Sequence, residues 1–430
     1  MKIAVPVFPS FYKRACLVFV CILCCSAIAL AQAGKRKTVF IIVDGIPADV
    51  IEKLPLPQLA SIAQQGGYTR SYVGGKKGTY SQTPTISAVG YNSVLTGVWV
   101  NKHNVWDNDI AAPNYHYPTI FRLFKEQYPA GKTAIFSSWQ DNRTKLVGDK
   151  LPATGNLPID ISYDGLEHDS LHFPHDKQRD FMQRIDDSVS ARAAAVIRSA
   201  APDLSWVYLE HTDDMGHMYG DSPQFYNAVV AADRRIGEIW KAIQFRQQQY
   251  KEDWLIIVTT DHGRDAATGK GHGGQSDRER DSWIYTNAKN LNEQFHAPQA
   301  AAVDIMPSIA RFMKIALPQN IAREVDGTPF IGPLSFITPS CSQQQQKLIF
   351  QWKATAPGGH MKIWASTTNQ FNTGGKDEYK LMGSFPLQAQ EAVIDLARMP
   401  SSFYKIVLEA PGNTANCWLD DKGNQPMKRK

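Results

Sequence analysis

The stretch Val39-Phe40-Ile41-Ile42-Val43-Asp44-Gly45 is an uninterrupted apolar run that ends in an acidic residue and a glycine. An apolar run without polar alternation indicates a strand that is buried on both faces. The Asp-Gly pair then favours a turn at the carboxyl end of that strand. This segment therefore predicts a core strand that delivers a carboxylate to one edge of a sheet.

Three further apolar runs follow along the chain, and amphipathic helical patterns separate them. The runs are residues 132–136, 204–209 and 254–260, and the helical patterns include residues 184–199 and 222–250. Buried strands that alternate with helices predict an α/β domain with a largely parallel central sheet. In such a sheet, ligands collect at the carboxyl ends of the strands. We therefore expect Asp44, Asp261 and the segment 210–217 to lie near one another.

The character of the sequence changes after Pro339. Short apolar segments at residues 347–352, 361–365, 392–395 and 403–409 alternate with glycine-rich turn signals. This pattern predicts a small C-terminal β-sandwich of roughly 80 residues. We divide the chain into residues 1–33, 34–338 and 339–430, with the second boundary lying between 336 and 342.

The first 33 residues have the layout of a secretory signal peptide. Lys2, Lys13 and Arg14 precede the apolar run of residues 15–30, and small residues near Ala33 offer cleavage sites. That run is shorter than the roughly 20 residues of a membrane span, which favours a cleaved leader over the alternative of an anchor. We expect a periplasmic or secreted protein with no membrane span after cleavage.

Cleavage changes the charge and the cysteine content of the mature chain. Removing residues 1–33 takes away three basic residues and no acidic ones, so the formal charge falls from +5 to +2. Nothing then suggests the concentrated basic face that binds nucleic acid or an anionic membrane. Only Cys341 and Cys417 remain of the six cysteines. They leave no thiolate cluster for a metal and allow one disulfide across the C-terminal module.

Aspartate and histidine residues occur with the spacing of metal ligands. Asp213 and His217 are four positions apart, so one helical turn places both on the same face. Asp261 and His262 are adjacent at a strand end, and His272 lies in a glycine-rich loop. Such ligands without thiolates suit catalytic zinc or manganese. Each motif alone also fits a salt bridge, a helix cap or a solvated loop, so the prediction of a metal site depends on the whole set.

Together these motifs resemble those of the nucleotide pyrophosphatase/phosphodiesterases of the alkaline phosphatase superfamily. The matching segments are residues 41–45, 208–217 and 260–263, among which D-x-x-G-H and D-H-G are the most specific. The resemblance extends over residues 38–332 and leaves the C-terminal module outside. It implies an alkaline-phosphatase-like fold, with helices around the sheet. It also implies two divalent ions, most simply zinc, and the hydrolysis of phosphate diesters or monoesters.

The resemblance also implies a role for each matching residue. One ion would be bound by Asp213, His217 and His272, and the other by Asp44, Asp261, His262 and a nucleophilic hydroxyl. The family places this hydroxyl ten residues before the glycine of a T-G pair, and counting back from Gly97 gives Ser87. A phosphate-binding asparagine follows twenty-one residues later, which gives Asn108. The implied course runs through a covalent phosphoseryl intermediate.

The sequence departs from the family in two places. The relatives usually have threonine as the nucleophile, followed by an aromatic-proline pair, whereas Ser87 is followed by Ala88-Val89. Thr85 therefore stays open as an alternative nucleophile. The last histidine, His272, follows the D-H-G motif sooner than in the relatives.

Several other interpretations remain open at this point. The chain could transfer a phosphoryl-alcohol group to a glycan, or hold metal without catalysis while its C-terminal module contacts glycan or the cell surface. A sulfatase is disfavoured because no C-x-P-x-R or S-x-P-x-R motif surrounds Ser87. Arg143 and Lys145 are candidates for binding a phosphate monoester, although chance placement in a loop explains them as well. For His168, His172 and His175, a solvated polar loop is the simpler interpretation than a further metal site.

Overall fold

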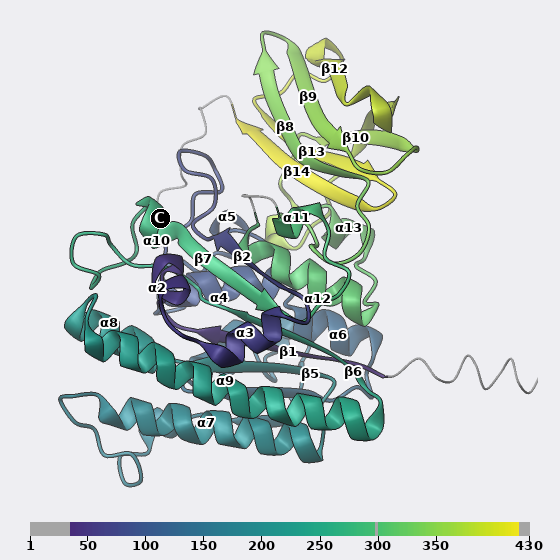
Figure 1. The fold of residues 1–430 in the computed structure, drawn as a ribbon. Coiled ribbons are helices and arrows are strands. Elements are labelled where there is room, and N and C mark those ends of the chain that lie inside the picture. Colours follow the sequence, from purple (N-terminus) through teal and green to yellow (C-terminus); the bar gives the residue numbers. More distant parts are fainter. Residues whose placement is uncertain (1–34, 297–299, 421–430) are drawn as a thin grey trace, which may run out of the picture.

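The computed structural model describes residues 35–296 and 300–420. These residues form an α/β domain around one seven-stranded sheet and a C-terminal module of two antiparallel sheets (Figure 1). The predicted α/β class with a largely parallel sheet is thereby confirmed. The expected signal peptide lies outside the described residues.

The central sheet is parallel in its middle and has antiparallel strands at one side. Its strand order is β2-β7-β6-β1-β5-β3-β4. The pairs β6–β1, β1–β5, β5–β3 and β3–β4 are parallel, whereas β7 runs antiparallel to both β6 and β2. The strands are β1 (Arg36–Val43), β2 (Gly67–Tyr72), β3 (Thr133–Ser137), β4 (Ile161–Tyr163), β5 (Leu204–Leu209), β6 (Asp253–Thr259) and β7 (Asp281–Thr286).

Helices cover both faces of this sheet. The hydrophobic core on one face contains side chains of α2, α3, α7, α8 and α9, and the core on the other face contains side chains of α4, α6 and α12. The helices are α2 (Ala48–Lys53), α3 (Pro57–Ala63), α4 (Ser87–Thr96), α5 (Val100–His103), α6 (Ile120–Gln127), α7 (Asp180–Ser199), α8 (His211–Tyr219), α9 (Pro223–Tyr250), α10 (Asp277–Arg280), α11 (Glu293–His296), α12 (Ile305–Met313) and α13 (Gln319–Ala322).

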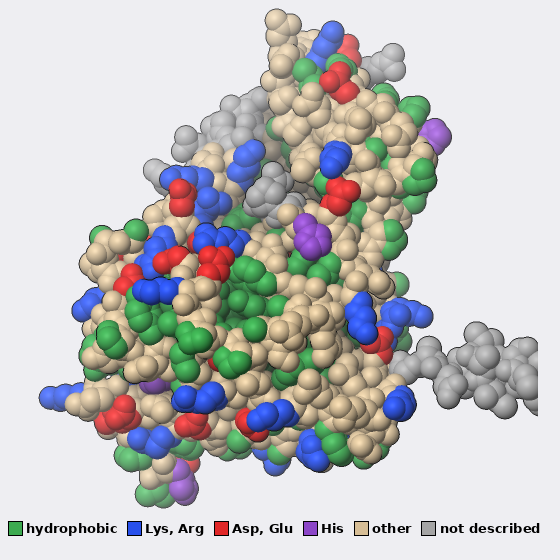
Figure 2. Space-filling model, viewed as in Figure 1, with side chains coloured by type: hydrophobic (Ala, Val, Ile, Leu, Met, Phe, Trp, Pro, Cys, Tyr) green, Lys and Arg blue, Asp and Glu red, His purple; other side chains and the backbone are tan. Residues whose placement is uncertain are grey.

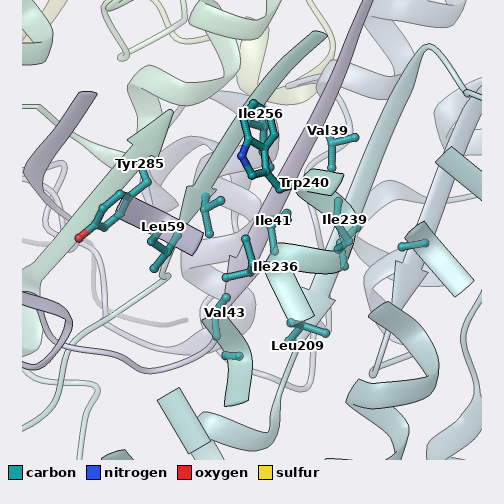
Figure 3. Close-up of a cluster of buried hydrophobic side chains, with 14 of the residues drawn as sticks. Val39, Ile41, Val43, Leu59, Leu209, Ile236, Ile239, Trp240, Ile256 and Tyr285 are labelled. Carbon is teal, nitrogen blue, oxygen red and sulfur yellow. The ribbon is translucent and has the colours of Figure 1, made fainter. Parts of the chain in front are cut away.

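Strand β1 shows why its sequence has no polar alternation. Val39, Ile41 and Val43 point into the core that α3 and α9 share (Figure 3). Phe40 and Ile42 belong to the core on the opposite face. Both faces of the strand are covered. Alternate residues therefore pack into one core and the residues between them pack into the other, so all of them are apolar.

The register of the parallel strands brings three acidic residues to one edge of the sheet. Val43 of β1 pairs with Leu209 of β5, and Ile42 of β1 pairs with Thr259 of β6. Asp44, Glu210 and Asp261 follow these strands and therefore emerge at the same carboxyl edge. Helix α8 begins at His211, directly after β5, and starts at this edge as well.

The C-terminal module is a sandwich of two antiparallel sheets around its own core. One sheet has the order β11-β10-β13-β14 and the other β12-β9-β8. Apolar side chains of both sheets, such as Phe350 and Ile406, share one hydrophobic cluster. The strands are β8 (Phe336–Gln344), β9 (Lys347–Ala354), β10 (His360–Ser366), β11 (Lys380–Pro386), β12 (Glu391–Asp395), β13 (Phe403–Ala410) and β14 (Asn413–Asp420).

The surface agrees with the modest net charge expected for residues 34–430. On the face drawn in Figure 2, Lys and Arg side chains are interspersed with Asp and Glu, and they form no continuous basic face there. Among the helices that the structure describes, none combines the length and the apolar character that crossing a membrane would need.

Cys341 of β8 and Cys417 of β14 lie in contact between the two sheets of the module. They are free thiols, and the hydrogen bond between them, together with burial, raises the pKa of the Cys341 thiol. We expect these thiols to form a disulfide when the protein is exposed to an oxidising compartment. The Cys341→Ser variant should then lose about 2–4 kcal/mol of unfolding free energy relative to the oxidised protein.

Thiol titration under denaturing, non-reducing conditions checks this prediction. The oxidised protein should show no reactive thiol in its mature chain, and reductant should lower its melting temperature to that of the Cys341→Ser variant. Two titratable thiols in protein isolated from an oxidising compartment would contradict it.

Candidate active site

Asp44, Asp261 and His262 form a buried group at the carboxyl edge of the sheet. Their ligand atoms lie within 4.8 Å of one another. His262 Nε2 is 3.3 Å from Asp44 Oδ1 and 3.3 Å from Asp261 Oδ2. Neither of these two carboxylate oxygens has a hydrogen-bond partner among the described residues, although both are fully buried. Buried oxygens without partners are costly, and this suggests that a cation belongs between them.

The tautomer of His262 strengthens this conclusion. Its Nδ1 lies 2.9 Å from the carbonyl oxygen of Gly263, so Nδ1 carries the proton and Nε2 presents a lone pair. Burial, followed by the nearby His272, lowers the pKa of His262 well below its ordinary value, which keeps the ring neutral. Two carboxylate oxygens and an imidazole lone pair thus converge without a proton between them. Such a set of acceptors fits a divalent metal ion.

A second group lies beside the first and shares His262 with it. Asp213, His262 and His272 have ligand atoms within 4.8 Å of one another, and the rings of His262 and His272 stack with centroids 3.7 Å apart. His217 Nε2 is 3.1 Å from Asp213 Oδ2 and 3.1 Å from His272 Nε2. His272 Nδ1 donates to the carbonyl oxygen of Thr85 at 2.9 Å, which directs Nε2 toward the cluster.

All six residues predicted as ligands therefore lie in one cluster, although they come from four separate segments. The charge of this cluster also favours cations. Burial, followed by the charges of Asp261 and Asp213, raises the pKa of Asp44 well above its ordinary value. Three carboxylates this close repel one another, and bound cations would relieve that repulsion.

Ser87 is the first residue of α4 and lies next to this cluster. Its Oγ is 3.3 Å from His262 Nε2. Asn108 lies over the same helix end, where its Oδ1 accepts a hydrogen bond from the Ala88 N–H at 3.0 Å. This bond occupies the amide oxygen of Asn108 and leaves its NH₂ group as a donor. The helix N-terminus and this amide together present positive potential beside the Ser87 hydroxyl.

Helix α4 reaches the cluster closely because of Gly90. A Cβ at this position would lie 2.6 Å from the main-chain oxygen of Asp261 and 2.8 Å from its Cβ. Only glycine allows the helix to pack this tightly against the end of β6. The close packing brings Ser87 next to the candidate metal ligands.

Thr85, the alternative nucleophile, is engaged elsewhere. Its hydroxyl donates to the Gly274 carbonyl at 2.9 Å and accepts the Gly273 N–H at 2.9 Å. These bonds, and the hydrogen bond that the Thr85 carbonyl accepts from His272 Nδ1, anchor the glycine-rich loop. Thr85 therefore serves to position His272.

Two tyrosines orient Asp44, and the sequence did not assign them this role. The hydroxyls of Tyr91 and Tyr208 both donate to Asp44 Oδ2, the latter at 2.6 Å. Burial, followed by the charge of Asp44, raises the pKa of each tyrosine well above its ordinary value, so both remain protonated donors. Since Oδ2 is taken, Oδ1 is the oxygen that faces His262. Tyr91 is fully buried and so lies beneath the site rather than lining an open pocket.

Arg264 is a further residue that sequence reasoning missed. It is fully buried, and its guanidinium donates to the Asp213 carboxylate, to the Gly45 carbonyl at 2.9 Å and to the Lys270 carbonyl at 3.0 Å. Against the effect of burial, the charge of Arg264 lowers the pKa of Asp213. The glycine of the D-x-x-G-H motif makes room for it, since a Cβ on Gly216 would lie 2.1 Å from Arg264 Cζ.

The other candidate residues have ordinary structural partners. Arg143 forms ion pairs with Asp149 at 2.6 Å and Asp164 at 2.6 Å, and Lys145 pairs with Asp141 at 2.8 Å. Among the described residues, the acidic and histidine groups that could hold a metal do not include His168, His172 or His175. His172 instead lies 2.8 Å from Asp169, and His175 lies 3.0 Å from the Glu167 carbonyl.

The sequence matches the profile of the type I phosphodiesterase / nucleotide pyrophosphatase family over residues 38–312, more than half of the chain. The chain belongs to this family. The match includes the segments that carry all six clustered ligands together with Ser87 and Asn108. The C-terminal module lies outside it.

Individual relatives of this family member are distant. Venom phosphodiesterase CdcPDE of Crotalus durissus collilineatus is 22% identical over 188 residues, which are 42% of this chain and 21% of that protein. The chain thus spans about a fifth of the length of this relative. Ps i-CgsB in complex with k-i-k-neocarrahexaose is 15% identical, with a TM-score of 0.49 over 75% of this chain and 84% of that one. Murine ectonucleotide pyrophosphatase / phosphodiesterase 5 in complex with AMP is 13% identical, with a TM-score of 0.47 over 66% and 97%.

Proposed function

We propose that this chain is an exported, metal-dependent phosphoesterase that cleaves phosphate diesters through a phosphoseryl intermediate on Ser87. The observation that carries the proposal is the position of the Ser87 hydroxyl. It lies at the N-terminus of α4 and 3.3 Å from His262 Nε2. This nitrogen belongs to a cluster of carboxylate and imidazole groups that could hold metal ions. Membership of the phosphodiesterase family supports the reaction class. The sequence of residues 1–33 supports export.

The cluster would hold two divalent ions, with zinc as the first candidate and manganese as the second. Such ions lower the pKa of a bound hydroxyl and offset charge on the attacking and leaving oxygens. We assign Asp44, Asp261 and His262 to the ion nearer Ser87. Asp213, His217 and His272 would hold the other, and His262 lies between the two groups.

The chemistry then proceeds in two displacements at phosphorus. Ser87 Oγ, having lost its proton to solvent, forms a bond to phosphorus while the bond from phosphorus to the first alcohol oxygen breaks. That oxygen takes a proton from water. In the second displacement, a water molecule attacks phosphorus, the bond to Ser87 Oγ breaks, and the serine regains its proton.

Asn108 and the N-terminus of α4 are suited to the charge that develops on the phosphoryl oxygens. The NH₂ group of Asn108 and the Ser87 N–H at the start of the helix are donors fixed in place before substrate arrives, whereas the Ala88 N–H is bonded to Asn108 Oδ1. Donors that need no reorientation stabilise a developing negative charge more than water does.

We infer a preference for diesters over monoesters because the two basic residues considered for monoester binding already form ion pairs. A monoester dianion carries one more negative charge and needs an additional cation, but Arg143 and Lys145 are both engaged in ion pairs. A charge-assisted hydrogen bond contributes about 1.5–3 kcal/mol, so its absence should cost the monoester at least about tenfold in kcat/KM.

The test compares bis-p-nitrophenyl phosphate with p-nitrophenyl phosphate, using purified protein loaded with zinc and, in parallel, with manganese. We expect a higher kcat/KM for the diester with either metal. Faster turnover of the monoester would overturn the diester assignment. Absence of turnover of both substrates with both metals would overturn the phosphoesterase proposal.

A further inference from the structure

The loop that carries Asn108 has little regular structure of its own. It runs from residue 104 to residue 119, between α5 and α6. Within the α/β domain, His103 holds its first part through a bond from the Val105 N–H to Nδ1 at 3.1 Å and a bond from the Asn114 N–H to the His103 carbonyl at 2.9 Å. Asn108 itself is exposed. Farther along the loop, Tyr115 donates to the Lys145 carbonyl, and its own carbonyl accepts a hydrogen bond from Arg122 at 3.1 Å. Residues 114–117 have a further support that helps to keep the Asn108 amide fixed.

The C-terminal module supplies that support at three successive points. The Asn114 side-chain NH₂ donates to both the main-chain oxygen and Oδ1 of Asn372, each at 2.9 Å. Tyr117 packs edge-on against Phe371, with ring centroids 5.1 Å apart. The imidazole of His116 lies directly over Gly374, where a Cβ would approach it to 2.5 Å.

The turn that makes these contacts is itself fixed by a buried ion pair. The Asp377 carboxylate accepts the main-chain N–H of Gln370 at 2.7 Å and that of Phe371 at 3.2 Å. Lys405 donates to Asp377 at 2.8 Å and also to Glu324 of the α/β domain. The side chains of Lys405, Asp377 and Glu324 are all at most 2% exposed. Breaking such a buried pair is costly, so the turn is held firmly against the α/β domain.

A residue of α5 near the start of the loop is held by the same module. Lys102 of α5 is fully buried and donates to Asn416 Oδ1 of β14 at 3.0 Å, to Asp326 at 2.5 Å and to the Glu324 carbonyl at 2.7 Å. The module lies against α5 and α13 in Figure 1, where these contacts occur. The Asn108 loop is therefore anchored to the module at both ends.

We propose that the C-terminal module positions the Asn108 loop for catalysis, with Asn372 as the positioning residue. The inference rests on the proposed function, because it concerns the donor that would meet the phosphoryl oxygens. Asn372 does not touch the substrate in this proposal. It acts through Asn114, by holding the loop in the conformation in which Asn108 caps the start of α4.

The test compares Asn372→Ala and Asn114→Ala with the control variant Gln388→Ala. Gln388 is also an amide side chain of the module, and it bonds to the Ala356 carbonyl within the module at 2.7 Å. Hydrogen exchange of the main-chain amides of residues 104–117 gives a readout that does not need activity. We expect faster exchange in both loop-contact variants and an unchanged rate in Gln388→Ala.

Kinetic measurements with and without the Asn108 side chain distinguish a positioning role of Asn372 from a general loss of structure. With Asn108 present, Asn372→Ala should lower kcat/KM for bis-p-nitrophenyl phosphate by about tenfold, since a displacement near 1 Å can cost about 10²-fold. In an Asn108→Ala background the same substitution should have almost no further effect. Equal losses in both backgrounds, or loop exchange indistinguishable from that of Gln388→Ala, would overturn the inference. If the parent protein cleaves neither ester, the proposed function fails and the exchange rates alone decide the positioning.

Discussion

The Ser87→Ala variant is expected to lose kcat/KM toward bis-p-nitrophenyl phosphate by about 10⁴-fold or more, the scale observed when an enzyme loses its nucleophile. Ser87 Oγ lies 3.3 Å from His262 Nε2, at the point where the ligand cluster meets the N-terminus of α4. Without this hydroxyl no phosphoseryl intermediate can form. Steady-state rates at saturating zinc measure the loss, and acid-quenched mass spectrometry of the parent enzyme should find a p-nitrophenylphosphoryl group on the peptide that contains Ser87.

Thr85→Val is the matched control for this prediction. The Thr85 hydroxyl bonds to Gly274 and Gly273, so its removal should loosen the His272 loop and reduce kcat/KM by about tenfold at most. Ser87→Thr retains a hydroxyl at the nucleophile position and should keep measurable turnover. If Ser87→Ala kept a tenth of the parent activity, or if Thr85→Val lost as much as Ser87→Ala, Ser87 would not be the nucleophile.

The central strands could be predicted because burial on both faces requires a continuous run of apolar residues. The apolar runs at residues 132–136, 204–209 and 254–260 correspond to β3, β5 and β6. Strands β2, β4 and β7 were not predicted. β2 is an edge strand with a mostly half-buried, polar sequence, so it lacks both the continuous run and the alternation that mark a strand. Its antiparallel pairing with β7 follows from the tertiary fold rather than from a local pattern.

The candidate metal ligands could be proposed because they occur in short motifs directly after strands. D-H at the end of β6 and D-x-x-x-H on α8 are local patterns, and the parallel register brings them to one edge. Their supporting residues leave no such signal. Arg264 and Tyr208 reach Asp213 and Asp44 only through folding, and an isolated arginine or tyrosine in a sequence has many structural roles. His262 belongs to both groups because of its distances to them in the folded structure, and these distances leave no pattern in the sequence.

The effect of the Asp261→Asn substitution on stability should have opposite signs in the metal-bound and the metal-free protein. With zinc, the substitution removes a charged ligand, and we expect both a lower melting temperature than the parent and a loss of kcat/KM of about 10³-fold. Without metal, the substitution removes one of three clustered carboxylates that repel one another. The metal-free variant should then be more stable than the metal-free parent at pH 8, by at least about 2 °C in melting temperature.

The pH dependence of the metal-free proteins gives the sign of the electrostatic effect. Burial, with the charge of Asp213 adding to it, raises the pKa of Asp261 from its ordinary value of 3.8 to about 7. Between these values the folded parent binds more protons than the unfolded chain, so its stability should fall as the pH rises from about 4 to about 7. The Asp261→Asn variant lacks this titrating group. The difference in stability between the metal-free variant and the metal-free parent should therefore become smaller as the pH falls toward 4.

Asp160→Asn is the control, because Asp160 lies away from the site and titrates in the opposite direction. Against the effect of burial, hydrogen bonds from Thr133 and Lys125 lower the pKa of Asp160 to about 2. Removing this carboxylate should destabilise the protein at neutral pH by the same amount with and without zinc, since neither candidate metal group found among the described residues includes it. Thermal unfolding of the three proteins between pH 4 and pH 8, with zinc and with chelator, measures both effects. A metal-free Asp261→Asn variant less stable than the parent at pH 8 would show that the cluster has no unrelieved repulsion for cations to offset.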